Sequence, residues 1–484
     1  MGLSVALNAA RGSLQANAVQ TDVVSRNIAG VDDSAYSRKI ASLVTTEGPV
    51  RVVVNRASDT ALFDKMIGST SELAGREAIL DGLKRLEETV GDTQADQSIA
   101  AKISALNVAL GNAANLPNDN NLAKAAVVAA QDLARSLNHA SDTVQSTRAN
   151  ADAEIDNSVK TINDLLAQFD TANKAVVLGT ARGADISDAL DTRDKILAQL
   201  SREVGISTIV RAGNDMAVYA DNGSPLYERG ARTVTFETTP DFGAGTSGHA
   251  VFIDGVSVTG KGSVMPLQAG RIVGQMTVRD EIGVTYQKQF DAIAGGLINA
   301  LAETDQTAST GPALTGLLTY PGGPALPTAT TGLASVIRIN PAADLAQGGN
   351  PFTLRDGGMN TGAQYTYNTT HAAAFADRLR ALRSALGTDR TFAADSELPL
   401  SASLQAAAES SASWLEATRK VASVQVDSES ALLNRASTAL SNATSVNRDD
   451  EVAAMLELEK SYAASAKLIA TIHAMLQSLL DAVR

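Results

Sequence analysis

The 484-residue sequence lacks cysteine and is poor in aromatic residues, which make up 4% of the chain and include a single Trp. Without cysteine, the protein can form neither a disulfide framework nor thiolate metal ligands. The scarcity of aromatic side chains, together with abundant Ala, favours long slender helices over one thick core. Ala-rich helices form readily, because Ala has the highest intrinsic helix propensity.

Long apolar runs are also missing. No stretch of eighteen consecutive apolar residues occurs in the sequence, so we predict no membrane-spanning helix. Arg11, Gln15, Asn17 and Gln20 interrupt the first segment, which therefore does not have the continuous apolar region of a signal peptide. We expect that, if the chain leaves the cytoplasm, it does so without a cleaved leader.

Clustered positive charge is absent as well. The formal net charge is -13, and Lys and Arg do not gather in any one stretch. Nucleic-acid binding needs such clusters for phosphate contacts, so we expect no nucleic-acid partner. The histidines are scattered along the chain, at His139, His249, His371 and His473. This spacing gives no reason to predict a metal site, and we expect no cofactor.

What the sequence does contain is a heptad pattern at each of its two ends, with apolar residues at steps of three and four. The N-terminal seam comprises Leu3, Leu7, Ala10, Leu14, Val24 and Ile28, with Asn17 and Thr21 as polar interruptions. The C-terminal seam comprises Met455, Leu458, Tyr462, Ile469, Ile472, Leu476 and Leu479, interrupted by Ser465. Isolated amphipathic helices are marginal in water, so we expect the seams to cover each other or to be covered by neighbouring chains. Periodicity alone fits the face of a monomeric bundle equally well.

Between the seams, the patterns predict a bundle of helices with a small β insertion. Helical periodicity covers residues 59–90, 92–110, 120–168, 285–303, 371–386 and 401–440, with a break at residues 116–118, Leu-Pro-Asn. Extended segments with glycine-containing turns cover residues 39–45, 50–54 and 208–284. Residues 304–334 lack periodicity and are interpreted as a loop or linker, and residues 336–356 hold at most a reduced β segment. Asn447 is the expected N-cap of the last helix.

We therefore predict a mainly α-helical α+β fold in which the terminal helices pair as a coiled coil. The length allows two to four domains. The predicted parts are a coiled-coil helix (1–30), a helical bundle with a short β-hairpin (31–204), a β-rich domain (205–284), a helix with a linker and reduced β segment (285–400), a bundle helix (401–446) and a second coiled-coil helix (447–484).

One group of carboxylates is compatible with chemistry. Asp188, Asp191 and Asp194 would share a helix face, where carboxylates could bind a cation or do acid–base work. We expect instead that Asp191 pairs with Lys195 four residues later, and that the Arg193-Asp194 pair braces the bundle.

Two further patterns match known motifs by spelling alone. Residues 243–248, Gly-Ala-Gly-Thr-Ser-Gly, have the spacing of a dinucleotide fingerprint, but no helix is predicted after them to receive a pyrophosphate. We interpret them as a flexible hairpin loop. Residues 241–243, Asp-Phe-Gly, spell the metal-binding triplet of kinases, without a Gly-rich loop or catalytic-loop motif elsewhere. We regard this match as chance.

Residues 24–38 resemble the N-terminal signature of bacterial flagellar axial proteins, in which a helix ending in Ser-x-Asn-Ile-Ala-Asn runs into Gly-Tyr-x-Arg. The corresponding segments here are Val-Ser-Arg-Asn-Ile-Ala-Gly (24–30) and Ala-Tyr-Ser-Arg (35–38). The residues that carry the resemblance are Asn27, Ile28, Ala29, Tyr36 and Arg38. We expect Gly30 to end the helix in the left-handed conformation that glycine tolerates.

A second segment narrows the resemblance. The stretch around Arg193 and Asp194, from Asp188 to Leu200, resembles a segment of the flagellar hook-associated proteins, and residues 462–467 resemble the Tyr-x-Ala-x-Ala-x of their last helix. The chain is thus similar to the hook-associated protein 1 family, which forms the hook–filament junction.

The resemblance implies a structural protein with no catalytic role. Such a chain would be exported unfolded by the flagellar type III pathway and would assemble with copies of itself as a ring at the end of the hook. Its further partners would be the hook protein, a second junction protein beneath the filament, and a cytoplasmic export chaperone. The chaperone would dock on the last helix at Ile469, Ile472 and Leu476. The seams would form an inner tube, the middle helices an outer layer, and the β domain the outermost surface.

Three alternatives remain at this point. Other flagellar axial proteins, of the hook or rod type, share the terminal seams. A flagellar enzyme acting on cell-wall glycan would need a cleft with paired acid and base groups, and the sequence indicates none. A coiled-coil signalling module would normally carry a membrane span.

Overall fold

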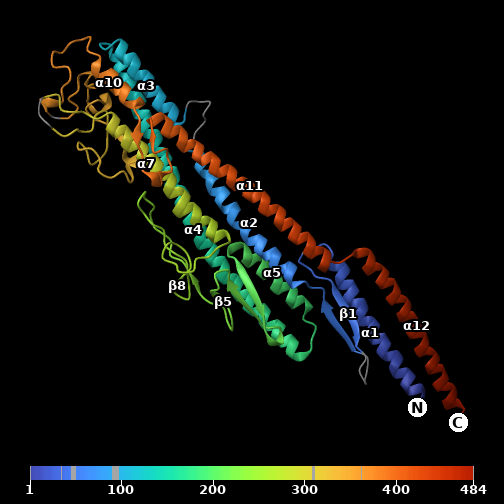
Figure 1. Cartoon of the computed structure of the whole chain (residues 1–484). Coiled ribbons are helices and arrows are strands. Elements are labelled where there is room, and N and C mark those ends of the chain that lie inside the picture. The colour runs from blue at the N-terminus through green and yellow to red at the C-terminus, as the bar shows by residue number, and fades with distance from the viewer. Residues whose placement is uncertain are drawn as a thin grey trace.

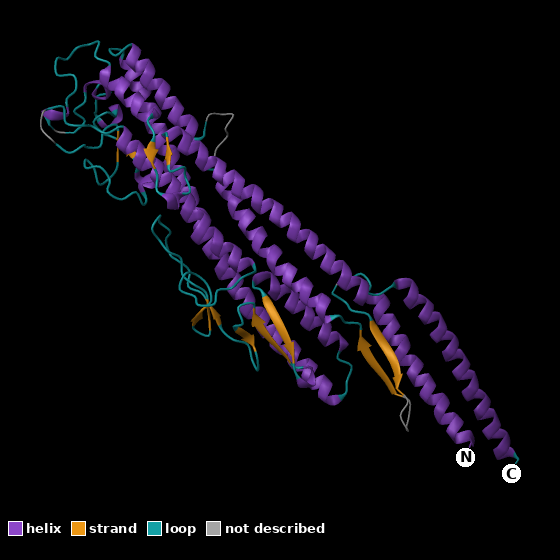
Figure 2. Ribbon diagram, in the orientation of Figure 1, coloured by secondary structure: helices purple, strands orange, loops and turns teal. Residues whose placement is uncertain are grey.

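The computed structural model describes residues 2–33, 35–44, 51–89, 97–307, 311–360 and 362–482. The molecule is a long rod, with both termini side by side at one tip and irregular loops around short helices at the other end (Figure 1). Helices run along most of its length, and the strands form small sheets beside them (Figure 2). The prediction of a mainly helical fold with small β sheets is confirmed.

Five long helices form the shaft of the rod. They are α2 (Thr60–Glu87), α3 (Ile99–Asn115), α4 (Asn120–Arg182), α5 (Ser187–Glu203) and α11 (Leu404–Thr444). In four of them a short polar side chain just before the helix accepts a hydrogen bond from a backbone N–H of the first turn, which satisfies a group that the helix itself leaves unpaired. These N-caps are Asp59, Ser98, Asp119 and Ser403. The predicted break at residues 116–118 is confirmed, since it separates α3 from α4.

A further helical stretch begins earlier than the sequence predicts. It comprises α6 (Arg271–Thr277), one wide turn called η3 (Val278–Ile282) and α7 (Gly283–Ala300), so its start is at residue 271 and not at 285. Gly274 lies inside α6, where a Cβ would clash with the backbone oxygen of Gly75 in α2. This glycine therefore allows two helices to approach closely and does not end a helix.

The head of the rod is built from short elements between α7 and α11. They are β9 (Leu318–Thr319), α8 (Leu333–Val336), β10 (Arg338–Ile339), η4 (Leu345–Gln347), α9 (Thr353–Asp356), η5 (Ala363–Tyr365), α10 (Asp377–Gly387), β11 (Arg390–Thr391), η6 (Ala394–Ser396) and β12 (Ser401–Ala402). The helix predicted from residue 371 begins at Asp377, because His371 has φ of 53° and cannot start a right-handed helix.

The described residues of the stretch 304–334 form mainly irregular loop, in agreement with the prediction, but they pack into the core of the head and are not a free linker. Leu317, Leu318 and Leu333 are buried in the same apolar cluster as Leu297 of α7 and Leu137 of α4. In the reduced β segment that follows, β10 pairs antiparallel with β9. These leucines are not regularly spaced in the sequence, because turns bring them into the core. Periodicity therefore could not predict that they are buried.

The predicted β-rich part holds two three-stranded antiparallel sheets on the side of α4 (Figure 1). The first contains β3 (Ile206–Val210), β4 (Met216–Ala220) and β5 (Pro225–Tyr227), and the second β6 (Val234–Thr235), β7 (Phe252–Ile253) and β8 (Val256–Ser257). Together with α4, α5 and α6 they enclose a second apolar cluster. The turn between β7 and β8 has positive φ at Asp254 and Gly255, as tight hairpins require.

A separate hairpin lies beside the N-terminal helix, near the tip of the rod that carries the termini (Figure 2). It consists of β1 (Lys39–Val44) and β2 (Arg51–Arg56), paired antiparallel from Lys39 opposite Arg56 to Val44 opposite Arg51. The turn predicted between the two strands, Glu-Gly-Pro at residues 47–49, lies outside the described part of the chain. Isolated two-stranded hairpins are marginal in water, so this one depends on the helix beside it.

Candidate assembly interface

The two terminal helices, α1 (Gly2–Gly30) and α12 (Arg448–Asp481), pack against each other and extend beyond the shaft (Figure 1). Their relative position is fixed by three hydrogen-bonded pairs: Ser13 with Ser465, Asn17 with Ser461, and Asn27 with Glu451. Each step along α1 is matched by an equal step back along α12, which is the register of an antiparallel pair. The prediction that the terminal helices pair is confirmed.

On α1, the seam residues lie at or near the surface that α12 covers. Ala10 and Val24 are buried, and three others are half-buried, namely Leu7, Leu14 and Ile28. The side chain of Leu3 lies outside the described part of the chain. Val23 is buried too, although the heptad pattern did not include it. The buried stripe is therefore wider at the end of α1 that meets the hairpin.

On α12, the seam residues divide into two groups. Ile472 is 5% exposed. Four others are half-buried, namely Met455, Leu458, Ile469 and Leu476. Tyr462 and Leu479 are 52% and 54% exposed. The contact between the two helices thus covers one narrow face of α12.

Polar side chains sit inside this seam. The Oγ atoms of Ser13 and Ser465 are 3.2 Å apart, and Asn17 Nδ2 donates a hydrogen bond of 2.9 Å to Ser461 Oγ. The sequence predicted Asn17 and Ser465 as interruptions, and the structure shows that they lie in the interface itself. A polar pair in an apolar seam favours one register, because any shift leaves a buried donor unpaired.

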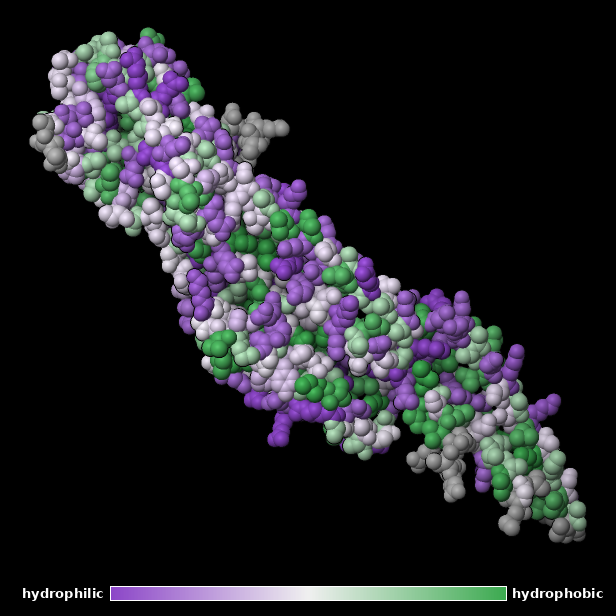
Figure 3. Space-filling model, in the orientation of Figure 1, coloured by the Kyte–Doolittle hydropathy of each residue, from purple (hydrophilic) through white to green (hydrophobic). Residues whose placement is uncertain are grey.

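Most of α12 remains uncovered by the rest of the chain. Among its described side chains, only those of Glu451 and Ile472 are buried. The large apolar side chains that are more than half exposed are Leu456, Tyr462, Leu468, Met475, Leu479 and Leu480. Figure 3 shows apolar surface, in green, continuing along the terminal pair to the tip of the rod. Apolar surface of this extent is typical of an interaction site.

The motif residues of the N-terminal signature meet at the base of the terminal pair. Asn27 Nδ2 donates hydrogen bonds to Lys39 O (2.8 Å) and to Glu451 Oε2 (3.0 Å), while Asn27 Oδ1 accepts from Tyr36 OH (3.0 Å) and Lys39 N (2.9 Å). Arg38 Nε donates to the other oxygen of Glu451 at 2.7 Å. We call these five residues the motif network. It joins α1, β1 and α12.

Gly30 serves the same network in a way that the sequence did not reveal. It is not among the residues with positive φ, so the expected left-handed helix end is wrong. A Cβ at this position would lie 2.6 Å from the ring of Tyr36. Glycine is required here for space, since the Tyr36 ring crosses the end of α1 to reach Asn27. Of the other motif residues, Ile28 is half-buried and Ala29 is exposed.

Sequence reasoning missed the part played by Glu451. The prediction that Asn447 caps α12 is confirmed, because its side chain accepts from Asp449 N at 3.1 Å. Glu451 was considered only as one of the acids that suit a helix N-terminus. In the structure it is 2% exposed and accepts hydrogen bonds from two motif residues. Neighbouring Arg448 pairs with Asp32 at 3.3 Å, which adds a link to the turn after α1.

The acidic face of α5 binds basic residues from other elements. Asp188 pairs with Lys39 of β1, and Asp191 lies 3.1 Å from Arg56 of β2. The expected pair between Asp191 and Lys195 is wrong, because Asp191 is turned toward the hairpin, within 3.6 Å of Lys39. Burial raises the pKa of Asp191 even though Arg56 and Lys39 lower it. The carboxylates thus meet protein cations and leave no reason to invoke a bound metal.

Arg193 and Asp194 point in different directions from α5. Arg193 is buried and donates through Nη1 to Asn214 O (2.7 Å) and to Asn173 Oδ1 of α4 (3.2 Å). Burial lowers the pKa of the Arg193 guanidinium. Asp194 instead pairs with Arg56 at 2.5 Å. Arg193 therefore braces α5 against α4 and the β3–β4 turn, whereas Asp194 links α5 to the hairpin.

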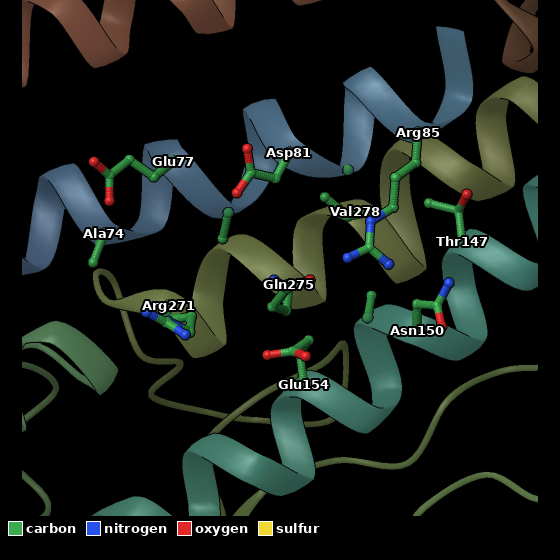
Figure 4. Close-up of a pocket in the computed structure, with 13 residues that line it drawn as sticks. Ala74, Glu77, Asp81, Arg85, Thr147, Asn150, Glu154, Arg271, Gln275 and Val278 are labelled. Carbon is green, nitrogen blue, oxygen red and sulfur yellow. The ribbon is translucent and has the colours of Figure 1, made fainter. Parts of the chain in front are cut away.

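A polar cleft of about 220 Å³ lies between α2, α4 and α6 (Figure 4). Its charged lining has both signs and comprises Glu77, Asp81, Arg85, Glu154 and Arg271. No histidine lines it in the described part of the chain, and Gly82 at its wall is in close contact with Val278. The cleft is a groove between packed helices and does not offer a nucleophile with a base.

The remaining sequence patterns give no chemical site within the described ranges. No group of three or more His, Asp or Glu side chains there is placed to hold a metal ion. The Gly-rich loop at residues 243–248 is tied to α4, because the Arg148 guanidinium donates to the carbonyl oxygens of Gly243 (3.1 Å) and Thr246 (2.6 Å).

One helical stretch, Leu404–Asp481, is long and apolar enough to pass a length-and-composition test for a membrane span, although the sequence contains no wholly apolar run. The relevant window is only 6% buried within the molecule. A single match of this kind is weak evidence for a span. The exposed apolar residues of α12 contribute to the apolar composition on which this test depends.

Two family models of flagellar proteins match separate parts of this chain. The family model described as "Flagellar hook-associated protein FlgK helical domain" matches residues 83–314. A second model, "Flagellar basal body rod FlgEFG protein C-terminal", matches residues 440–482, which include α12 and Glu451.

Three known proteins illustrate the similarity. Flagellar hook-associated protein 1 of Bacillus subtilis (strain 168) is 24% identical over 239 residues, covering 46% of this chain and 47% of that protein. The protein of the same name from Salmonella typhimurium (strain LT2) is 19% identical over 292 residues, covering 58% and 52%. The solved flagellar hook junction protein FlgK of Burkholderia pseudomallei aligns over 53% of this chain and 46% of its own, at 20% identity and a TM-score of 0.43. The matches span about half the length of the curated relatives.

Proposed function

The chain belongs to the flagellar hook-associated protein 1 family, and on this premise we propose that it is a structural junction protein between the hook and the filament of a bacterial flagellum. The observation that carries the proposal is the terminal helix pair. It stands clear of the shaft, and α12 exposes large apolar side chains along most of its length. A monomer has no use for this surface, whereas a subunit in a ring would cover it with copies of itself.

The layout of the rod supports a radial arrangement in such a ring. The terminal pair would form the inner tube, the shaft helices an outer layer, and the two β sheets the outer surface. The sheets lie on the flank of α4 opposite α11 (Figure 1). The ring would rest on the hook protein and carry a second junction protein beneath the filament. The protein would reach this place outside the cell through the flagellar type III pathway.

A role in the rod or hook is the nearest alternative. The match at residues 440–482 supports it, since that family model is named for basal body rod proteins. The match at residues 83–314 favours the junction instead, because it covers the helical domain of hook-associated proteins and includes most of the shaft. The terminal helices alone would not separate the two roles.

Position on the flagellum tests the proposal directly. Immunogold labelling of isolated flagella, with antibody raised against the full chain, is expected to place gold at the boundary between hook and filament. Labelling along the hook or within the rod would reject the junction role in favour of the alternative. Flagella from a strain that lacks this protein are the control for the antibody.

We also propose that the export chaperone binds α12 at Ile469, Ile472 and Leu476. These three side chains are turned toward α1, and Ile472 is almost fully covered. A chaperone that binds these three side chains must therefore occupy the position of α1 on α12. It can do so only before α1 and α12 pair. Chaperone binding and pairing of the terminal helices would then exclude each other, which suits a chain that is exported unfolded.

An Ile469→Asp substitution is expected to weaken binding of the organism's flagellar export chaperone by about tenfold or more, because a carboxylate would be taken from water into an apolar contact. Ring assembly should fall as well, while the shaft stays folded. Leu468→Asp is the matched control, since Leu468 is the adjacent residue but is half exposed on the outer side. Titration calorimetry measures the affinities. Equal affinities of the Ile469 variant and the unchanged protein would reject the docking site.

A further inference from the structure

The rod has two separate apolar cores. The head cluster contains the buried apolar residues of the head and of the shaft near it, and the β-side cluster lies beside the two three-stranded sheets. Along α4, the head cluster ends at Val144 and the β-side cluster begins at Ile155, roughly 16 Å further along the helix axis. In the adjoining helical stretch, the same boundary falls between Met276 and Ile282. Within the described chain, the apolar interior is therefore interrupted at one level of the rod.

Charged side chains occupy the level between the two cores. Arg148 and Arg279 are fully buried, and Asp152 is 2% exposed. Arg279 Nη1 donates to Asp152 Oδ1 at 2.6 Å, and Arg148 Nε donates to Arg279 O at 2.8 Å. We call these three residues the belt. The cleft in Figure 4 lies at the same level of α4, so the shaft is polar on two sides here.

One irregular segment, residues 236–250, covers the belt. It leaves β6, extends toward the head and returns to β7 (Figure 1). Phe236, at its start, packs against the β-side cluster. At its far end, a Cβ on Gly245 would lie 3.6 Å from Thr331 Cγ2 of the head. We call this segment the strap, and it contacts both halves of the rod.

The belt holds the strap by hydrogen bonds to both of its arms. The pairs are Arg148 with Gly243 O and Thr246 O, Arg279 with His249 O, and Asp152 with Thr239 N. Among the described residues, the remaining acceptors of Arg148 are Arg279 O and Gln145 Oε1, so its buried cation has only uncharged partners. A buried charge without partners is costly, so the strap cannot lift unless water enters and hydrates the belt. Lifting of the strap therefore opens the interior of the rod as well.

Two glycines show how closely the strap and the belt fit together. A Cβ at Gly248 of the strap would clash with the guanidinium of Arg279, and a Cβ at Gly283, the first residue of α7, would lie 2.7 Å from Arg148 Cγ. Neither glycine has positive φ, so both positions need glycine for space and not for backbone conformation. An added methyl group at residue 248 must displace the strap or the guanidinium, and either movement breaks the contact with His249 O.

We propose that the strap couples the head to the β-rich half of the rod, and that its release lets the β-rich half unfold locally while the head stays folded. The β-rich half comprises the two sheets, α5, α6 and the part of α4 beyond Asp152. Segments with separate cores open as separate units unless an interface joins them. Both α2 and α4 pass along both halves, but packing stabilises a helix more than its own propensity does, so neither helix couples the cores by itself. This inference concerns the isolated chain and holds or fails independently of the junction role.

Hydrogen exchange of the full chain, followed by mass spectrometry, measures the opening of each half. The amides of β4 report the β-side cluster, which contains Val218, and those of α7 report the head cluster. Gly248→Ala is expected to make the β4 amides exchange about tenfold faster and to leave the α7 amides unchanged. Gly243→Ala is the matched control in the same strap, because a Cβ there would lie 3.6 Å from Thr246 Oγ1 and fits without displacement.

A replacement tie gives an independent test. Arg148→Met removes the contacts at the tip of the strap and should accelerate the β4 amides in the same way, whereas Arg135→Met removes an exposed arginine from the same helix as the control. In the Arg148→Met chain, which has no cysteine of its own, Gly245→Cys and Thr331→Cys allow a disulfide between the strap and the head. Oxidation is expected to return the β4 amides to within about twofold of their rate in the unchanged protein, and reduction to accelerate them again. The fluorescence of Trp414, which packs against the head cluster, checks that the head is folded in each variant.

Three results would overturn the coupling. The first is equal exchange of the β4 amides in Gly248→Ala and Gly243→Ala. The second is acceleration of the α7 amides together with those of β4, since the rod would then open as one unit. The third is no effect of oxidation on the Arg148→Met chain. Gly248→Ala leaves the side chains of the belt in place, so it decides the question even where Arg148→Met does not fold.

Discussion

Cells that produce the chain without residues 471–484 are expected to carry hooks without filaments and to release flagellin into the medium. The deletion removes Ile472, the most buried apolar residue of α12, together with Leu476. In the antiparallel register of the terminal pair, the lost turns lie opposite the first turns of α1. Leu7 of α1 would then be exposed. At the tip of the terminal pair, α12 would be missing and α1 would have lost the helix that covers it, so the inner face of a ring could not form there.

The defect should be specific to assembly, because neither apolar core cluster of the described residues includes a residue of α12. A circular dichroism spectrum with the helical signal of the shaft would establish that the rest of the chain is folded. A finer version replaces Ile472 with Asp and compares it with His473→Asp, since His473 is exposed next to it. Electron microscopy of the cells is the measurement. Motile cells with normal filaments would rule out the proposed function.

Features that depend on a few adjacent residues were predicted from the sequence. The break at residues 116–118 follows from one proline in a polar turn, and the Asn447 cap follows from a short polar side chain before a helix. The pairing of the termini was predicted because a heptad pattern states which face of a helix is apolar. Each of these signals acts over one or two turns, so no knowledge of distant segments is needed.

Features that depend on distant partners were not predicted. Gly274 was not identified as a packing residue, because its contact, Gly75, lies in another helix. The partner of Asp191 was placed on its own helix at Lys195, whereas the true partner, Arg56, is contributed by a hairpin far away in sequence. A helix-face pattern reveals that carboxylates point the same way, but it cannot reveal which element meets them.

The motif network shows how the two kinds of information combine. The resemblance to axial proteins identified Asn27, Tyr36 and Arg38 as residues of interest, but it did not indicate what these side chains contact. In the structure all three belong to one hydrogen-bond network, because Tyr36 donates to Asn27, and Asn27 and Arg38 both donate to Glu451. A sequence signature that joins the end of α1 to the start of α12 is what a protein needs if its two ends must be positioned together before assembly.

Glu451→Ala is expected to release the start of α12 from α1 and β1. Its carboxylate is almost fully buried and accepts from Asn27 Nδ2 and Arg38 Nε. Replacement by Ala leaves Arg38 without this partner and opens a space beside Asn27. Losing one partner of a buried charged pair costs about 2–4 kcal/mol, here nearer the lower value because Arg38 is partly exposed to water.

Hydrogen exchange of backbone amides, followed by mass spectrometry, measures this cost locally. The amides of the first turns of α12 and of β1 should exchange about 30-fold faster in Glu451→Ala, the factor that corresponds to about 2 kcal/mol. Asp450→Ala is the matched control, because Asp450 precedes Glu451 in the same turn, has the same favourable position near the helix N-terminus and is exposed. If both variants exchange alike, the loss comes from helix charge alone and the motif network does not hold the terminal pair. If only Glu451→Ala accelerates, and the amides of α4 keep their protection, the network is the point at which the two ends of the chain are joined.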